Sequence, residues 1–95
     1  MTPLHTLVLP RRHVVGYFDL DAEEKWVIGE LLDELRIDIL ARDPAVAGFN
    51  IGVNVGEAAG QTILHCHVHL IPRRWGDVTN PRGGVRAVIP GKADY

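Results

Sequence analysis

The longest regular pattern of apolar positions lies between residues 22 and 42. Its apolar side chains recur every three or four positions, which is the spacing of one buried face of a helix. They are Ile28, Leu31, Leu32, Leu35 and Ile39. Asp21 stands just before this segment and Glu24 follows three residues later, the pattern of a capping box. Asp43-Pro44 ends the pattern, because the residue before a proline avoids the helical conformation. The sequence therefore predicts a helix over residues 22–42 that packs on the core.

Three other segments have the patterns of strands. Residues 5–10 form a short apolar run closed by a proline, and residues 49–55 alternate apolar side chains with asparagine or glycine. Residues 63–71 alternate apolar side chains with histidine until Pro72, which we expect to end the strand. The first strand has no earlier strand to pair with, so its neighbour must come from later in the chain or from another subunit.

The segment between the second and third predicted strands is short and rich in small residues. Residues 56–62 begin with glycine and include another at position 60, which indicates a tight connection between antiparallel strands. Such pairing would bring Asn54 close to the start of the histidine strand, on the same face. The tail, residues 75–95, lacks periodicity; we expect a loop there, with at most a brief strand in the apolar run 85–89.

The composition of the chain is that of a globular protein. The chain has 95 residues, 46% of them apolar and 23% charged, as expected for one small globular domain. No apolar run approaches the roughly 20 residues of a membrane span, and no signal peptide follows Met1, so we expect a cytoplasmic protein. The single cysteine excludes an internal disulfide and a cysteine-rich zinc site.

Charge is distributed unevenly along the chain. Residues 20–43 hold eight acidic against three basic side chains (−5), whereas residues 61–92 hold five basic against one acidic (+4). The basic part contains the histidine strand, which would suit an anionic substrate. The acidic part is equally explained as the solvated face of a helix.

Three of the five histidines stand at alternate positions, His65, His67 and His69. In a strand they would share one face, with Cys66 pointing into the core on the other. A single zinc ion held by all three is disfavoured, because the outer two Cα atoms would be about 13 Å apart while zinc–nitrogen bonds are about 2.0–2.1 Å. Two of them together with His5 remain a candidate metal site.

Nucleophilic attack on phosphorus is the other chemistry that such a row allows. A neutral imidazole, with an ordinary pKa of about 6.5, can attack directly when an acceptor fixes its second nitrogen. Flanking histidines can donate to phosphate oxygens or protonate a leaving oxygen. Glycine-rich backbone with amide and hydroxyl side chains commonly cradles phosphate, and Asn54, Gln61 and Thr62 are residues of that type nearby.

The histidine segment resembles a known family signature. Residues 65–71, His-Cys-His-Val-His-Leu-Ile, are similar to the His-φ-His-φ-His-φ-φ motif of the histidine triad (HIT) superfamily of nucleotide hydrolases and transferases. Residues 60–62, 53–56 and 5–13 resemble further motifs of that family in the same order. Residues 72–77, Pro-Arg-Arg-Trp-Gly-Asp, resemble the diadenosine-polyphosphate hydrolase branch more than the phosphoramidase branch.

The resemblance implies a mechanism. His67 would attack the α-phosphorus of a nucleotide conjugate or dinucleoside polyphosphate, and water would hydrolyse the nucleotidyl-histidine intermediate. His69 would bond phosphate oxygens and His65 would support the nucleophile. The implied substrate-binding residues are Asn54, Gln61, Thr62 and His5, the last backing the triad from the first strand. No metal or cofactor is implied. A nucleotide-binding module with little or no turnover is the alternative.

The resemblance also implies an architecture. The family fold is α+β, an antiparallel sheet with one long helix. We expect a single HIT-like domain over residues 1–95 that lacks the strands usually found before the position of His5. The exposed sheet edge would then be completed by a homodimer. Neither a membrane nor a stable nucleic-acid partner is expected.

Overall fold

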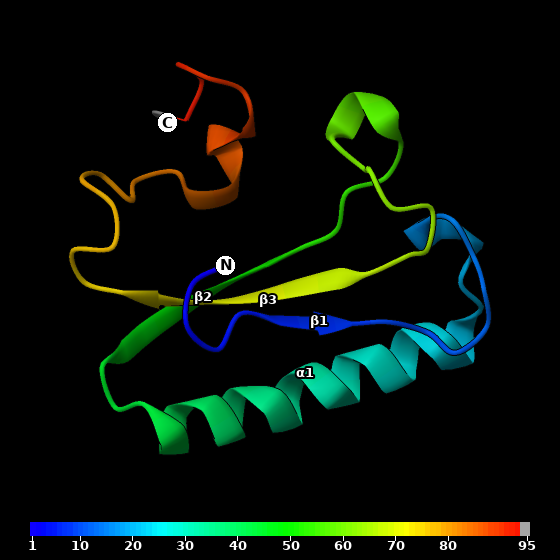
Figure 1. Ribbon diagram of the computed structural model, residues 1–95, viewed down its shortest axis with the longest axis horizontal. Helices are drawn as coiled ribbons and strands as arrows, with labels where there is room; N and C mark the ends of the chain where they lie inside the picture. Colours follow the sequence, from blue (N-terminus) through cyan, green and yellow to red (C-terminus); the bar gives the residue numbers. More distant parts are fainter. Residues whose placement is uncertain (94–95) are drawn as a thin grey trace.

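The computed structural model describes residues 1–93, in which one long helix packs against a three-stranded antiparallel sheet (Figure 1). The strands are β1 (Thr6–Val8), β2 (Val46–Gly52) and β3 (Val68–Arg74), and the helix is α1 (Ala22–Arg42). Three short 3₁₀ helices lie between or after them: η1 (Tyr17–Asp19), η2 (Glu57–Ala59) and η3 (Gly84–Val88). The predicted α+β class with one long helix is confirmed.

Helix α1 has the bounds that its sequence predicts. Asp21 Oδ1 accepts from the Glu24 backbone N–H at 2.7 Å, and Glu24 Oε1 accepts from the Asp21 N–H at 2.9 Å. These bonds form the predicted capping box and satisfy two of the backbone donors that a helix start leaves free. Ile28 and Ile39 are buried, but Leu31 is 39% exposed, so the buried face is narrower than expected.

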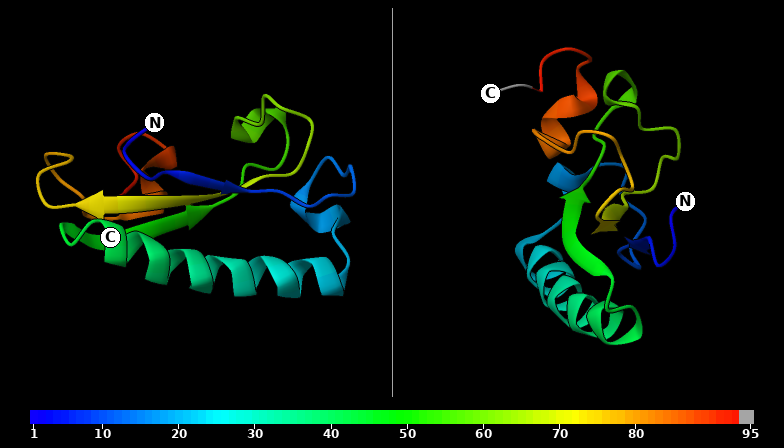
Figure 2. Two further views of the ribbon diagram at one scale, coloured as in Figure 1. Left: turned by 60° about the horizontal axis from the view of Figure 1, so that its bottom comes forward. Right: turned by 90° about the vertical axis from the view of Figure 1, so that its left-hand side faces the viewer.

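The strands lie in the order β1-β3-β2, with α1 across one face of the sheet. Strand β1 pairs with β3 in the register Thr6↔Leu70, so its neighbour does come from later in the chain. The opposite face lies beneath the segments that contain η2 and η3 (Figure 2). This opposite face carries His69, because its neighbours Val68 and Leu70 face α1.

Strand β3 begins and ends later than the predicted strand 63–71. Residues 63–67 lie outside the sheet ladder, and the chain bends at residues 63–65; the Cys66 N–H bonds to Val14 O at 2.8 Å instead of to a strand. Pro72 does not end β3, although it lacks an N–H. Pairing with β1 reaches only to Leu70, so at Pro72 the strand has β2 alone as a neighbour, a place where proline is tolerated.

Two further boundaries differ from the prediction. Strand β2 starts at Val46 and ends at Gly52, earlier at both ends than residues 49–55, and antiparallel pairing sets Gly52 opposite His69. The predicted antiparallel pair is present, but Asn54 lies beyond its end. The run 85–89 overlaps the 3₁₀ helix η3 and is not a strand, because Gly83 and Gly84 turn the chain with positive φ angles of 91° and 53°.

The core lies between α1 and the sheet. One buried cluster joins α1 through Ile28 to Val8, Cys66 and Val68, and a second joins Ile39 to Leu70. Cys66 is 1% exposed and faces the core as expected; burial raises the pKa of its thiol.

Among the described residues, no helix is both long and apolar enough to cross a membrane.

Candidate active site

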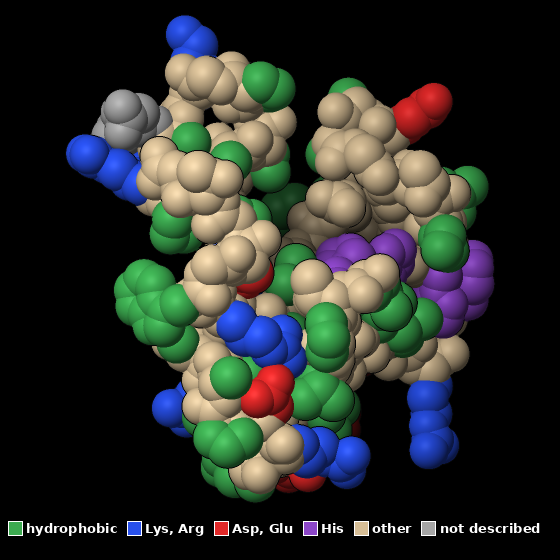
Figure 3. Space-filling model, turned by 60° about the vertical axis from the view of Figure 1, so that its left-hand side comes forward, with side chains coloured by type: hydrophobic (Ala, Val, Ile, Leu, Met, Phe, Trp, Pro, Cys, Tyr) green, Lys and Arg blue, Asp and Glu red, His purple; other side chains and the backbone are tan. Residues whose placement is uncertain are grey.

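The five histidines lie close together, and Figure 3 shows histidine side chains gathered on one part of the surface. Ring centroids are 5.0 Å apart for His13 and His65, 5.1 Å for His67 and His69, and 5.2 Å for His5 and His69. Of the three alternating histidines, only His69 belongs to β3; His65 and His67 lie in the segment before it. The predicted histidine cluster therefore exists, but strand geometry alone does not arrange it.

The ring of His67 is oriented by backbone. Its Nδ1 lies 2.9 Å from the carbonyl oxygen of His65, and a carbonyl can only accept, so Nδ1 carries the proton. In the neutral ring Nε2 then holds a free lone pair. His67 is half-buried, so part of the residue is open to solvent. This tautomer is the one that an attack through Nε2 requires.

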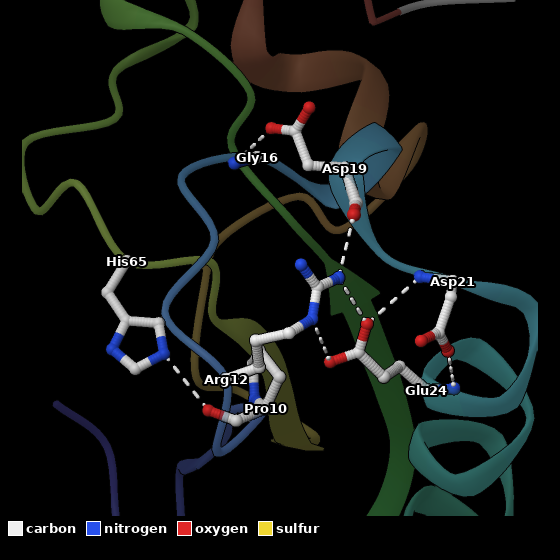
Figure 4. Close-up of polar contacts among 7 residues, drawn as sticks. All are labelled: Pro10, Arg12, Gly16, Asp19, Asp21, Glu24 and His65. Carbon is white, nitrogen blue, oxygen red and sulfur yellow. Dashed lines mark hydrogen bonds and ion pairs between the residues drawn. The ribbon is translucent and has the colours of Figure 1, made fainter.

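The ring of His65 is also held by a carbonyl. Its Nε2 donates to the oxygen of Pro10 at 3.0 Å, and this bond links the histidine segment to the loop after β1 (Figure 4). The exposed ring of His13 lies on the same loop, tilted by 46° to that of His65. His65 therefore contributes in two ways, through its ring to Pro10 and through its backbone to His67.

His69 and His5 share a hydrogen bond of 3.0 Å between His69 Nδ1 and His5 Nε2. The predicted position of His5 beside the triad is confirmed by this contact, while its effect on substrate stays a prediction. Desolvation lowers the pKa of His69, and the nearby His67 and His5 lower it further. His69 therefore stays neutral to lower pH than an ordinary histidine.

Gln61 is 5% exposed and bonds only to backbone. Its Oε1 accepts from the Gly56 N–H at 2.9 Å, and its Nε2 donates to Val15 O at 2.7 Å and to Ile63 O at 3.1 Å. Both amide hydrogens are therefore used within the protein. The expected contact of Gln61 with substrate stays a prediction, and in this structure its side chain fixes the loop before the histidines.

Asn54 and Thr62 are exposed on the loop that carries η2. In the described part of the chain neither side chain makes a hydrogen bond. Figure 3 shows this loop as one wall of a hollow beside the histidines, with the C-terminal segment as the opposite wall. Both residues are therefore available to a ligand, as their predicted role requires.

Within residues 1–93, no group of three or more His, Cys, Asp or Glu side chains is placed to hold a metal ion. His5, the candidate third ligand, instead bonds to His69.

Two parts of the site were not predicted from the sequence. The Pro10 carbonyl could not be, because a backbone carbonyl has no sequence pattern of its own. His13 could have been, because it is a histidine within residues 5–13, which resemble a family motif.

Comparison with known proteins decides the family. The family model described as "HIT domain" matches residues 1–76. The chain belongs to the HIT family. The resemblance inferred from the histidine motif is thereby confirmed, and 79% of this HIT chain aligns at 36% identity with 41% of the bis(5'-nucleosyl)-tetraphosphatase of Schizosaccharomyces pombe.

Other HIT relatives agree in sequence and fold. An uncharacterised HIT-like protein of Mycobacterium tuberculosis is 42% identical over 77% of this chain and 50% of its own length. A crystal structure of a HIT family protein from Bacillus anthracis is 42% identical, with a TM-score of 0.72 over 77% of this chain and 51% of that one. This HIT chain spans about half the length of the curated relatives it matches.

Proposed function

We propose that the protein is a nucleotide phosphohydrolase or nucleotidyl transferase that cleaves at the α-phosphate of a nucleotide conjugate or dinucleoside polyphosphate. Membership of the HIT family and similarity to a relative named as a nucleosyl-tetraphosphatase support this substrate class. The observation that carries the proposal is the bond from His67 Nδ1–H to the His65 carbonyl, because it leaves Nε2 free to attack.

In the first step the Nε2 lone pair of His67 attacks the α-phosphorus. A phosphorus–nitrogen bond forms while the phosphorus–oxygen bond to the leaving group breaks, and the leaving oxygen departs with the bonding pair as a phosphate anion. The Nδ1–H stays on the ring, which now carries a positive charge. The His65 carbonyl, 2.9 Å from Nδ1, stabilises that charge as it develops.

In the second step water attacks the nucleotidyl-histidine. A new phosphorus–oxygen bond forms, the phosphorus–nitrogen bond breaks, and the electron pair returns to His67 Nε2. The proton lost by water passes to solvent, so the enzyme is regenerated and a nucleoside monophosphate leaves. A different acceptor in place of water would make the reaction a nucleotidyl transfer.

Neighbouring residues serve this chemistry in different ways. When His5 Nε2–H donates to His69 Nδ1, the remaining proton of neutral His69 lies on Nε2, from which it can bond a phosphate oxygen. Asn54 and Thr62 stand exposed on the loop that carries η2 and can contact the phosphates or the leaving group. Gln61 holds the loop on which Thr62 lies.

The test is to trap the intermediate on a diadenosine polyphosphate labelled at the α-phosphate. Rapid quenching should place the label on the peptide that contains His67, in an acid-labile and alkali-stable bond. His67→Ala should abolish labelling and lower kcat by at least about 10³-fold, as loss of a covalent nucleophile does in other enzymes.

Two results would contradict the proposal. Turnover by His67→Ala at the wild-type rate would remove His67 as the nucleophile. Binding of AMP by calorimetry, without turnover of any labelled substrate, would instead identify a nucleotide-binding module.

A further inference from the structure

The loop from Pro10 to Gly16 holds the histidine segment at two points and the residue Gln61 before it at a third. His65 Nε2 donates to Pro10 O, the Cys66 N–H donates to Val14 O, and Gln61 Nε2 donates to Val15 O, at 3.0, 2.8 and 2.7 Å. All three bonds end on carbonyl oxygens of this loop. The position of the histidine segment therefore depends on how rigidly the loop is fixed.

Arg12 ties the same loop to the start of α1 (Figure 4). Its Nε and one terminal nitrogen lie 3.3 and 2.7 Å from the two carboxylate oxygens of Glu24, and the terminal nitrogen also donates to the Asp19 carbonyl at 3.0 Å. Glu24 Oε1 accepts in addition from the Asp21 N–H, so the carboxylate is fixed by the capping box. One guanidinium thus joins the loop, η1 and α1.

A second contact closes the loop at its other end. The Asp19 carboxylate accepts from the Gly16 N–H at 3.0 Å, across the turn that leads into α1. The backbone carbonyl of the same Asp19 is the one that Arg12 contacts. The loop is therefore anchored to the start of α1 through Arg12 and to η1 through Gly16, and its Pro10 and Val14 carbonyls accept from the histidine segment.

We propose that Arg12 and Glu24 are positioning residues for the nucleophile. Their ion pair fixes the loop that presents the Pro10 carbonyl to His65, and the His65 carbonyl in turn orients His67. The inference rests on the proposed function, because it concerns the same site. It assigns to an ion pair outside the histidine cluster a role in the rate of nucleotidyl transfer.

The competing explanation is an ordinary surface ion pair, which typically contributes about 0.2–1 kcal/mol to stability and nothing to the site. Two observations argue against it. The side chain of Glu24 is only 18% exposed, and the guanidinium bonds a carboxylate and a backbone carbonyl together. The bond from Arg12, with that from the Asp21 backbone, lowers the pKa of Glu24, so its carboxylate stays ionised to lower pH than an ordinary glutamate.

The kinetic test uses Arg12→Ala and Glu24→Gln with labelled diadenosine polyphosphate. We expect kcat to fall about 10-fold with KM changed less than about 2-fold, because small displacements of a reacting group slow the chemical step strongly. Glu24→Gln should remain folded, since a glutamine can still complete the capping box. Arg12→Lys should recover part of kcat, because an ammonium keeps the ion pair but not the paired geometry.

Matched controls come from α1 itself. Glu23→Gln removes a carboxylate from the same first turn, and within the described residues that carboxylate makes no hydrogen bond or ion pair. Arg42→Ala breaks the exposed pair with Asp38 at the far end of the helix. Both controls should leave kcat within about 2-fold of wild type, as surface substitutions usually do. Equal losses in controls and test variants would overturn the proposal.

A double-mutant cycle tests whether Arg12 acts through His65. Arg12→Ala should lower kcat about 10-fold in the wild-type background but less than about 2-fold in His65→Ala, because two residues on one route do not act additively. The same factor in both backgrounds would mean that Arg12 acts elsewhere, and would overturn the proposal.

A readout without activity separates this inference from the proposed function. In ¹⁵N-labelled protein, NMR should show His65 protonated at Nε2 and His67 protonated at Nδ1. Arg12→Ala should give a mixture of tautomers at His65 and faster exchange of its Nε2 proton, while Glu23→Gln should not. Unchanged His65 signals in Arg12→Ala overturn the positioning role, even if wild-type protein turns over substrate. The reverse result, altered signals with no wild-type turnover, would overturn the proposed function alone.

Discussion

The hydrogen bonds that orient His65 and His67 both end on backbone carbonyls, and this decides which nitrogen of each ring carries the proton. The residue types alone predict imidazoles that can attack, donate and accept. They cannot predict the tautomers, because the partners are main-chain oxygens of Pro10 and His65. At the scale of the residue, the sequence therefore predicts which side chains form the site but not their protonation.

The lowered pKa of His69 makes a prediction about stability. A histidine whose pKa is lower in the folded than in the unfolded protein stabilises the fold above its unfolded pKa of about 6.5 and progressively less as pH falls towards the folded pKa. We expect the free energy of unfolding to decrease as the pH is lowered through this window. The decrease should be less steep in His69→Gln. Urea denaturation at a series of pH values checks this; parallel curves for the two proteins would contradict it. His5 and His67, which face His69, are present in both proteins.

Gln61 illustrates another limit at this scale. Its place before the triad indicates a polar side chain with a role at the site, and its contact with substrate stays a prediction. In the structure the amide bonds Gly56, Val15 and Ile63. The bond to Val15 could not be predicted from the sequence, because 46 residues separate the two partners.

At the scale of the element, the bounds of α1 could be predicted completely and those of the strands only in part. The start and end of α1 are encoded within a few residues, by the capping box at Asp21 and by Asp43-Pro44. The start of β3 depends instead on competition for the backbone of Cys66, which bonds to Val14 on a distant loop. Alternation of apolar and polar residues does not reveal that competition, so the predicted strand began five residues too early.

The turn before η3 supplies a prediction at this scale. Gly83 has a φ of 91°, and a Cβ placed on it would overlap the carbonyl oxygen of Ala93. Gly91 has a φ of 76° but open space around it. Both alanine variants carry the strain of a left-handed conformation, about 1–2 kcal/mol, but only Gly83→Ala adds a steric overlap. Limited proteolysis should cleave after Arg86 faster in Gly83→Ala than in Gly91→Ala. Equal rates would contradict this account of the turn.

For the whole molecule, charge is more balanced than the sequence suggests. The basic segment around the histidines includes Arg73 and Arg74, but Arg73 pairs with Asp77 at 2.8 Å and Arg74 with Asp43 at 2.9 Å. The bond from Arg73 holds the pKa of Asp77 well below its usual range. These two arginines therefore brace the end of β3 and contribute little net field to attract an anion.

The outer edge of β1 leads to a prediction about assembly. Leu9 is 47% exposed beside a groove of about 420 Å³ between the end of β1 and α1, which Val27 and Leu31 also line. We propose that a second copy of the chain covers this edge, because an apolar strand edge favours pairing with another chain. Sedimentation velocity should show a dimer, and Leu9→Arg should shift it towards monomer.

Ile37→Arg is the matched control for Leu9→Arg. Ile37 is 65% exposed on α1 but does not line the groove. The dimer should survive this change. A monomeric wild-type protein would contradict the proposed assembly.

The contacts of the loop from Pro10 to Gly16 also bear on the order in which the site forms during folding. Its carbonyls receive their partners from residues 46 and 55 positions later, and His5 meets His69 across 64 positions. Contacts this distant along the chain are slow to form compared with the local contacts of α1. When the chain is synthesised from its N-terminus, residues 10–16 and all of α1 are present before His65, His67 and His69 have been added. The ring of His65 reaches the Pro10 carbonyl only when the segment before β3 meets this loop, so a partly folded chain holds the histidines without the contact that fixes His65.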